Sequence, residues 1–163
     1  FKYLAKIKLA CVVLLSVILM SCTDNANDPG AESRDDGLLV EGAYYRLPPP
    51  GLDKSAGYLN IQNTTEEDWL LMAVTSESVR AIEIHEIVDN DGQFSMRRRN
   101  ELLLPAGGSL ALKPGGFHLM LFGLEQSVIE SASDISFLLR FVAASDKNRA
   151  ELREAKATAV DVR

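Results

Sequence analysis

The stretch Val79–Arg98, which reads VRAIEIHEIVDNDGQFSMRR, decides the expected fold of this chain. Two β-type segments, Val79–Val88 and Gln93–Arg98, flank the turn sequence Asp89-Asn90-Asp91-Gly92. Alternation of apolar and polar residues is typical of a strand with one buried face, and Asp-Gly between two such segments is a strong hairpin signal. The stretch therefore predicts a β-hairpin.

The first strand of this hairpin has two unlike faces. Ile82 and Ile84 share one face and Glu83 and His85 share the other, because side chains alternate along a strand. We expect the isoleucine face to be buried. His85 then points away from the more apolar face, with Glu83 beside it as a candidate hydrogen-bond acceptor for its ring.

The hairpin turn decides which residue lies across from His85. If Asn90-Asp91 is the two-residue loop, His85 lies directly opposite Met96. If Asp91-Gly92 is the loop, His85 faces Arg98 and Met96 is its diagonal neighbour on the same face. A three-residue loop without a bulge would put His85 and Met96 on opposite faces.

A second pair of candidate ligands lies on the segment Phe117-His118-Leu119-Met120-Leu121. Alternation directs the phenylalanine and the two leucines inward and puts His118 and Met120 together on the opposite face. Their spacing on one strand is roughly 6 to 7 Å. Four side chains of two kinds, imidazole and thioether, therefore project outward in pairs from strands.

The rest of the chain after Leu38 consists of short β-type segments separated by turn residues, without long helical periodicity. This pattern predicts an all-β domain, an antiparallel sandwich or small barrel. Tyr44, Tyr45 and Trp69 are expected in the sheet or core, and Met72 in the core. The remaining expected strands are Leu39–Arg46, Ala56–Gln62, Trp69–Thr75, Ser109–Leu112, Phe117–Leu121, Ile135–Ala143 and Ala155–Val162.

The first 36 residues are typical of a targeting signal followed by a flexible tether. Three lysines precede the apolar run Leu9–Met20, which is too short to span a membrane and fits a secretory signal. The run ends at Leu19-Met20-Ser21-Cys22, which resembles a bacterial lipobox. We therefore expect a lipoprotein signal peptide over residues 1–21, a lipidated Cys22 with a flexible acidic tether over residues 22–36, and a folded domain over residues 37–163.

This N-terminus also predicts a location. The lipid would anchor the protein to the periplasmic face of a bacterial membrane without a transmembrane helix. Asp24 occupies the third position after cleavage, not the second, which favours the outer membrane by known sorting rules.

Cysteine usage and charge exclude several function classes. Cys11 lies in the signal and Cys22 would be acylated, so these two cysteines leave no thiol in the domain. Disulfides, cysteine zinc sites, cysteine nucleophiles and thiolate-bound blue copper are excluded. Removal of Lys2, Lys6 and Lys8 takes the net charge from −6 to −9, which disfavours nucleic acid as a partner.

The donor set itself favours copper. Thioether sulfur is a soft ligand that selects Cu(I) over hard cations, while imidazole accepts either copper state. Neutral thioethers are also easily replaced one at a time by the ligands of another protein.

The spacing of the four residues resembles a known signature. His85, Met96, His118 and Met120 match H-x10-M-x21-H-x-M of the periplasmic copper chaperone family of the PCu(A)C type, which is linked to assembly of the CuA centre of cytochrome oxidase. The flanking sequences agree, notably Ala56-Gly57-Tyr58-Leu59 and Pro114-Gly115-Gly116. The similarity extends from about Val40 to Val162.

The resemblance implies a cupredoxin-like Greek-key domain that is not an enzyme. It implies one Cu(I), near solvent, bound by His85, Met96, His118 and Met120. The copper would pass to an acceptor such as oxidase subunit II or a thiol-bearing copper chaperone. Some family members have a His- and Met-rich tail; this chain ends in Ala159-Val160-Asp161-Val162-Arg163, so a single site is expected.

Two other functions remain open from the sequence. The protein could buffer copper without a dedicated client, or it could be a structural or adhesive lipoprotein that binds no metal. An enzyme is disfavoured because the chain has no Ser/His/Asp spacing, no free thiol and no convincing carboxylate pair. We expect a monomer. Arg97–Arg99 is expected to be a solvated hairpin arm, with docking of an acidic partner as the alternative.

Overall fold

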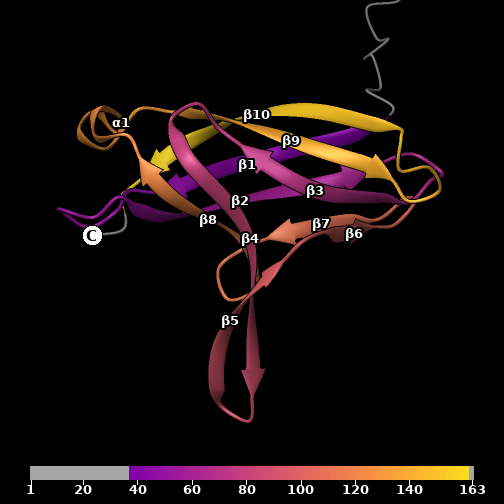
Figure 1. Cartoon of the computed structure of the whole chain (residues 1–163), viewed down its shortest axis with the longest axis horizontal. Coiled ribbons are helices and arrows are strands. Elements are labelled where there is room, and N and C mark those ends of the chain that lie inside the picture. Colours follow the sequence, from indigo (N-terminus) through magenta and orange to yellow (C-terminus); the bar gives the residue numbers. More distant parts are fainter. Residues whose placement is uncertain (1–36, 162–163) are drawn as a thin grey trace, which may run out of the picture. The chain divides into compact units, whose positions relative to one another are not determined.

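The computed structural model describes residues 37–161, which form ten strands and one short helix (Figure 1). The predicted signal peptide, Cys22 and the tether lie outside the described residues. The elements are β1 (Leu38–Arg46), β2 (Lys54–Asn63), β3 (Trp69–Thr75), β4 (Val79–Asn90), β5 (Gln93–Arg99), β6 (Leu102–Leu104), β7 (Ser109–Leu112), β8 (Phe117–Leu124), α1 (Gln126–Ser131), β9 (Ile135–Ala143) and β10 (Ala150–Val160).

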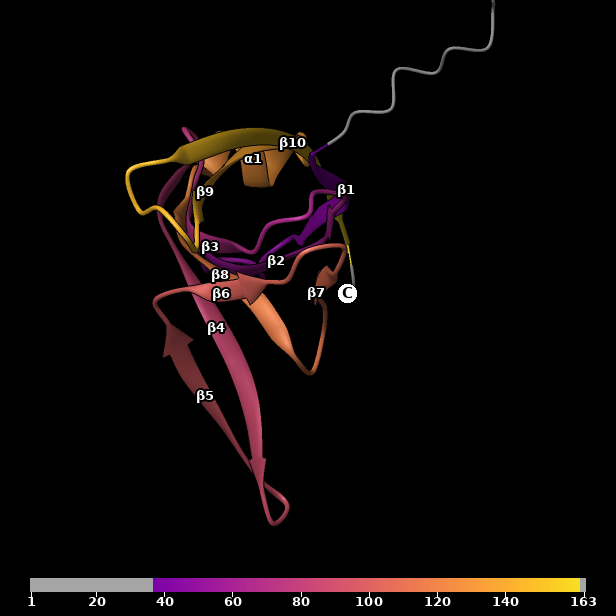
Figure 2. The ribbon, with the colours of Figure 1, turned by 90° about the vertical axis from the view of Figure 1, so that its right-hand side faces the viewer.

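The strands belong to one ten-stranded sheet that curls around the core (Figure 2). Its order is β5-β4-β8-β2-β1-β10-β9-β3-β6, and β7 pairs with β2. The β1–β10 pair is parallel, and all the other pairs are antiparallel. The predicted all-β class is confirmed, with this parallel pair as an addition to the expected antiparallel arrangement.

The core follows from alternation along the strands, which is clearest in the first seven residues of β9. In β9, Ile135, Phe137, Leu139 and Phe141 are buried while the residues between them are exposed. Burial of this kind supplies the main stabilisation of the fold, at about 1.5 to 3 kcal/mol for each large apolar side chain. Gly57 of β2 lies against this layer, since a Cβ there would come within 3.0 Å of the Phe137 ring. An alanine there would require the Phe137 and Leu121 side chains to shift slightly.

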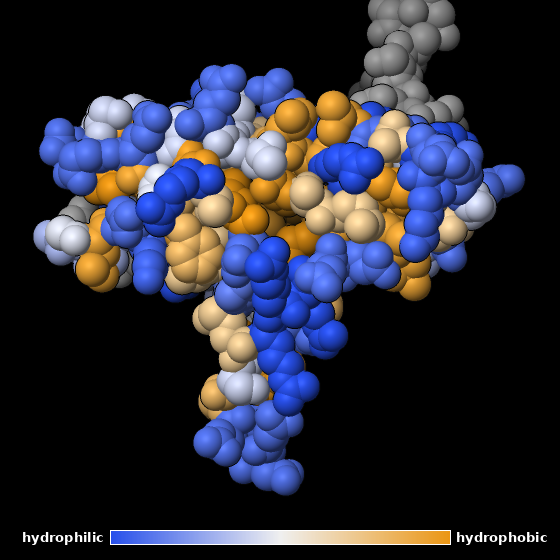
Figure 3. Space-filling model, in the orientation of Figure 1, coloured by the Kyte–Doolittle hydropathy of each residue, from blue (hydrophilic) through white to orange (hydrophobic). Residues whose placement is uncertain are grey.

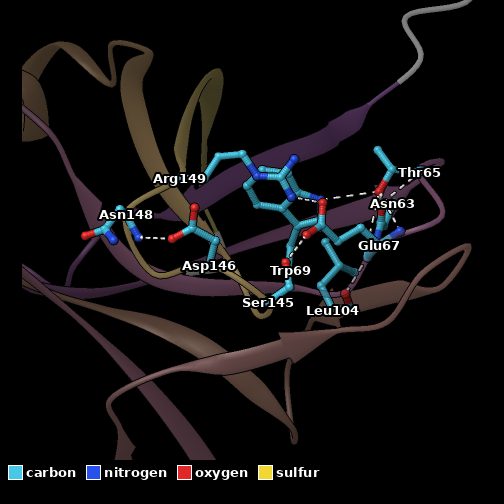
Figure 4. A network of polar contacts seen from close by, with 9 residues as sticks. All are labelled: Asn63, Thr65, Glu67, Trp69, Leu104, Ser145, Asp146, Asn148 and Arg149. Carbon is cyan, nitrogen blue, oxygen red and sulfur yellow. Dashed lines mark hydrogen bonds and ion pairs between the residues drawn. The ribbon is translucent and has the colours of Figure 1, made fainter.

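A polar network fixes the end of the domain where β2 leads into β3 (Figure 4). The buried amide of Asn63 donates to the Glu67 carbonyl at 2.7 Å and accepts from the Thr65 hydroxyl at 2.7 Å. Arg149 pairs with the Glu67 carboxylate and stacks over the buried Trp69 ring, 5.2 Å from its centroid. The network joins segments that are far apart in sequence, and its role is structural.

The β4–β5 hairpin projects from the rest of the domain as an arm (Figures 1 and 2). Asn90 pairs with Gln93, so Asp91-Gly92 is the loop. Both loop residues have positive φ, 55° and 86°, as a type I′ turn requires. Asp89 stabilises the turn by accepting the Gly92 N–H at 2.7 Å.

Three features of the fold differ from the sequence expectation. The three-residue strand β6 and the helix α1 were not predicted, because segments of three and six residues carry too little periodicity to be recognised. Met72 is only partly buried, which corrects its assignment to the core: the β3 register shifts between Leu71 and Ala73, so Met72 lies at an irregularity in the strand. Among the described residues, no helix is long and apolar enough to cross a membrane.

Candidate metal site

The two histidines face each other across neighbouring strands. His85 of β4 pairs with His118 of β8, and two residues further along Glu83 pairs with Met120. All four side chains share one face of the sheet because they are spaced by two residues on each strand. The two imidazole centroids lie 5.9 Å apart, with the ring planes at 66°. The predicted placement of His118 and Met120 on a common face is confirmed, and the structure adds His85 to that face.

The arm brings Met96 to the same face. With Asp91-Gly92 as the loop, His85 lies opposite Arg98, and Met96 lies opposite Ile87. The second of the two proposed hairpin registers is therefore the one that forms. Met96 is a diagonal neighbour of His85, at a typical Cβ separation of roughly 7 to 8 Å. A thioether side chain has enough rotatable bonds to turn from this position toward the imidazoles.

The imidazoles are less exposed than the sequence suggested. His118 is 4% exposed and the His85 side chain 13%, whereas Met96 is 52% exposed. The four side chains were expected to project outward from the strands, and the two rings do so in a largely buried position. The rings lie edge to face, and His118 Nδ1 is within hydrogen-bond distance of the Gly116 carbonyl oxygen.

Each ring has one nitrogen fixed by an acceptor. His118 Nδ1 lies 3.1 Å from the Gly116 carbonyl oxygen, and His85 Nε2 lies 2.8 Å from Glu83 Oε2. Because a carbonyl and a carboxylate can only accept, these nitrogens carry the hydrogens. His85 Nδ1 is buried without a hydrogen-bond partner. Buried polar atoms are rarely left unpaired, so this lone pair is available to a ligand.

Glu83 is held between two cationic or hydrogen-bonding groups. Its second oxygen, Oε1, lies 2.9 Å from Arg98 Nη1. The hydrogen bond from His85 is the largest cause that lowers the Glu83 pKa below its usual 4.5, and the charge of Arg98 lowers it further against the effect of desolvation. Glu83 is therefore ionised. The neighbouring Glu86 points to the other face, where it pairs with Arg99.

The β4–β5 arm is largely hydrophilic (Figure 3). The expectation of a solvated basic arm is confirmed, since Arg97, Arg98 and Arg99 are all exposed. Arg98 and Arg99 in addition pair with glutamates of β4 on opposite faces. The sequence analysis missed Arg98 as a partner of Glu83, although one of its two registers placed Arg98 beside His85.

The site differs in composition from the common sites for harder cations. Within residues 37–161, no group of three or more His, Cys, Asp or Glu side chains is placed to hold a metal ion. The arrangement here offers two imidazoles flanked by two thioethers, a set that suits a soft cation such as Cu(I).

Sequence comparison identifies the family. Residues 38–150 match the family described as "Putative lipoprotein LpqE-like". The chain is 31% identical over 118 residues to "Putative lipoprotein Lxx21020" of Leifsonia xyli, an alignment that covers 72% of this chain and 68% of that relative. It is 28% identical over 105 residues to protein RP573 of Rickettsia prowazekii, which covers 58% of each chain.

Solved structures share the fold. The copper-bound PCuAC domain from PmoF2 superposes with a TM-score of 0.56 at 19% identity, over 76% of this chain and 93% of that domain. The solution structure of CuI-DR1885 from Deinococcus radiodurans gives 0.54 at 22% identity, over 80% and 81% of the two chains. The chain therefore belongs to the LpqE-like family, and the part that the structure describes has the fold of PCuAC domains.

Proposed function

We propose that this domain is a copper chaperone that binds one Cu(I) through His85, Met96, His118 and Met120. The observation that carries the proposal is the pair of neighbouring imidazoles, each with one nitrogen held by an acceptor and the lone pair of the other nitrogen left for a metal. Metal-binding histidines use their second nitrogen in this way. The two thioethers lie on either side of the imidazole pair on the same sheet face.

The exposure of the four side chains suggests how the metal would leave. Met96 is half exposed on the arm, while His118 is buried in the sheet. An incoming ligand from an acceptor would displace the exposed, uncharged thioether first and the buried imidazole last. Stepwise exchange of this kind transfers a soft cation without releasing it to water. No catalytic step is required, so the protein acts as a carrier and not as an enzyme.

The acceptor and the location are part of the proposal. The acceptor is a protein with soft ligands, such as oxidase subunit II during CuA assembly or a thiol-bearing copper chaperone. The domain would act at the periplasmic face of a membrane, tethered by a lipid on Cys22, with the outer membrane favoured. The lipoprotein description of the family and of its Leifsonia relative supports this anchoring.

An anaerobic Cu(I) competition titration against a chromogenic chelator tests the proposal. The protein is used from Gly37 onward, because the described residues 37–161 have a hydrophobic core of their own. One tight equivalent is expected for the unmodified protein and none for His118→Ala/Met120→Ala. Met72→Leu removes a thioether from β3 as a control and should bind normally. Absence of binding by the unmodified protein would refute the proposal and favour a structural lipoprotein.

A further inference from the structure

We propose that Glu83 and Arg98 are positioning residues that fix the His85 ring so that it binds copper through Nδ1, while His118 binds through Nε2. This inference rests on the proposed Cu(I) site and specifies which atoms form it. It adds two residues that do not touch the metal.

Arg98, Glu83 and His85 form a chain of polar contacts on one sheet face. Glu83 and His85 are two residues apart on β4, and Arg98 lies directly opposite His85 on β5. The two oxygens of Glu83 are divided between its partners: Oε2 accepts from His85 Nε2 at 2.8 Å, and Oε1 pairs with Arg98 Nη1 at 2.9 Å. Arg98 therefore restrains the carboxylate that restrains the ring.

This chain of contacts determines the tautomer of His85. An ionised carboxylate requires a hydrogen on Nε2, so the lone pair of the neutral ring is on Nδ1. Nδ1 is buried and has no partner in the protein. The Glu83 bond thus presents a lone pair that the surrounding protein does not use, on the face shared with His118.

The His118 ring is held as the other tautomer, and by a different group. Its Nδ1 donates to the Gly116 carbonyl at 3.1 Å, which leaves Nε2 as the donor atom for a metal. The same carbonyl accepts the Ile87 N–H at 3.2 Å, so it is itself held by β4. One ring is oriented by a charged side chain and the other by the backbone. Only the His85 half of the site can therefore be altered by changing a carboxylate.

Nitrogen-15 NMR of the imidazoles tests the inference directly. In the copper-free protein at a pH where the rings are neutral, we expect His85 as the Nε2–H tautomer and His118 as the Nδ1–H tautomer. Addition of Cu(I) should shift His85 Nδ1 and His118 Nε2. A larger copper-induced shift at His85 Nε2 than at His85 Nδ1 would overturn the proposal.

Variants separate the positioning role from a general loss of charge. Glu83→Ala should give mixed His85 tautomers and weaken Cu(I) binding by about 10- to 100-fold, the usual effect of removing a partner of a metal ligand. Glu83→Gln keeps an acceptor oxygen and should retain the tautomer, with a smaller loss of affinity. Arg98→Ala should also weaken Cu(I) binding, but by less than Glu83→Ala does.

Glu86→Gln is the matched control, because Glu86 is also a β4 carboxylate paired with arginine but lies on the opposite face. It should change neither the tautomer nor the affinity. Unchanged His85 tautomer and affinity in a folded Glu83→Ala protein would refute the inference. If the unmodified protein binds no Cu(I), the proposed function fails, while the tautomers of the copper-free variants still decide whether Glu83 positions His85.

Discussion

Leu119 and Met120 are adjacent on β8 but are expected to respond in opposite ways to mutation. Leu119 lies in the core and is 0% exposed. Met120 lies on the other face of the sheet, where it pairs with Glu83. Leu119→Ala leaves a cavity and should lower the free energy of unfolding by about 3 kcal/mol. For a domain of this size we expect the Tm to fall by about 10 to 15 °C.

The same change should leave copper binding intact, because the cavity lies on the face away from the imidazoles. Met120→Leu should behave in reverse. It conserves volume and should cost less than about 1.5 kcal/mol of stability. Since it removes a sulfur donor, it should weaken Cu(I) binding by at least the roughly 10- to 100-fold expected for loss of a partner of a metal ligand.

The assays are thermal unfolding followed by circular dichroism, and Cu(I) competition at a temperature where both variants are folded. A tenfold loss of affinity in folded Leu119→Ala would refute the assignment of faces along β8. Unchanged affinity in Met120→Leu would remove Met120 from the proposed ligand set.

Four further outcomes are expected. Cu(I) affinity should fall as the pH is lowered from about 8 to about 5 in a competition titration, because protons compete for the free imidazole nitrogens; a constant affinity would argue against histidine ligation. Because the pKa of Glu83 is lowered in the folded state, its contribution to stability is present above pH 4.5 and is lost as the pH falls through the lowered pKa. The free energies of unfolding in urea of the unmodified protein and of Glu83→Gln should therefore converge in acid. A difference that stays constant with pH would contradict this. Gly92→Ala should cost about 1 kcal/mol in the same assay, since φ is 86° and the site is open; no cost would argue against the type I′ turn. Asn63→Ala should cost about 1 to 3 kcal/mol by leaving buried groups unpaired, and a neutral result would show that the network in Figure 4 is dispensable.

Alternation and turn chemistry accounted for most of the fold. The period of two along Ile135–Phe141 is strong because one face of that strand is buried and the other is exposed. In Val79–Val88 the pattern is weaker, since both faces of the strand are partly covered. The parallel contact between β1 and β10 was beyond such reasoning, because it joins the two ends of the domain and depends on how the whole sheet curls. Local patterns contain no information on pairing at that separation.

The candidate site was predictable as a set of residues but not as an environment. Spacing put His118 and Met120 on one face of their strand, and both hairpin registers brought Met96 beside His85. The contact between the two pairs depends on the β4–β8 pairing, which spacing does not reveal. Burial of the rings depends on neighbours from β4, β8 and the loop before β8, which a single strand does not reveal. The bond between Glu83 and Arg98 required the actual register of the arm.

The arm explains why one ligand of the proposed site differs from the others. Among the described strands, β5 is bonded to β4 alone, whereas β8 is held on both sides by β4 and β2. His118 and Met120 therefore belong to the interior of the sheet, and Met96 belongs to an edge strand with fewer restraints. A site built this way keeps its imidazoles in fixed positions while one thioether moves without disturbing the core. Such a difference in restraint suits a protein that must hold a metal ion firmly and still release it to a partner that approaches from the exposed side.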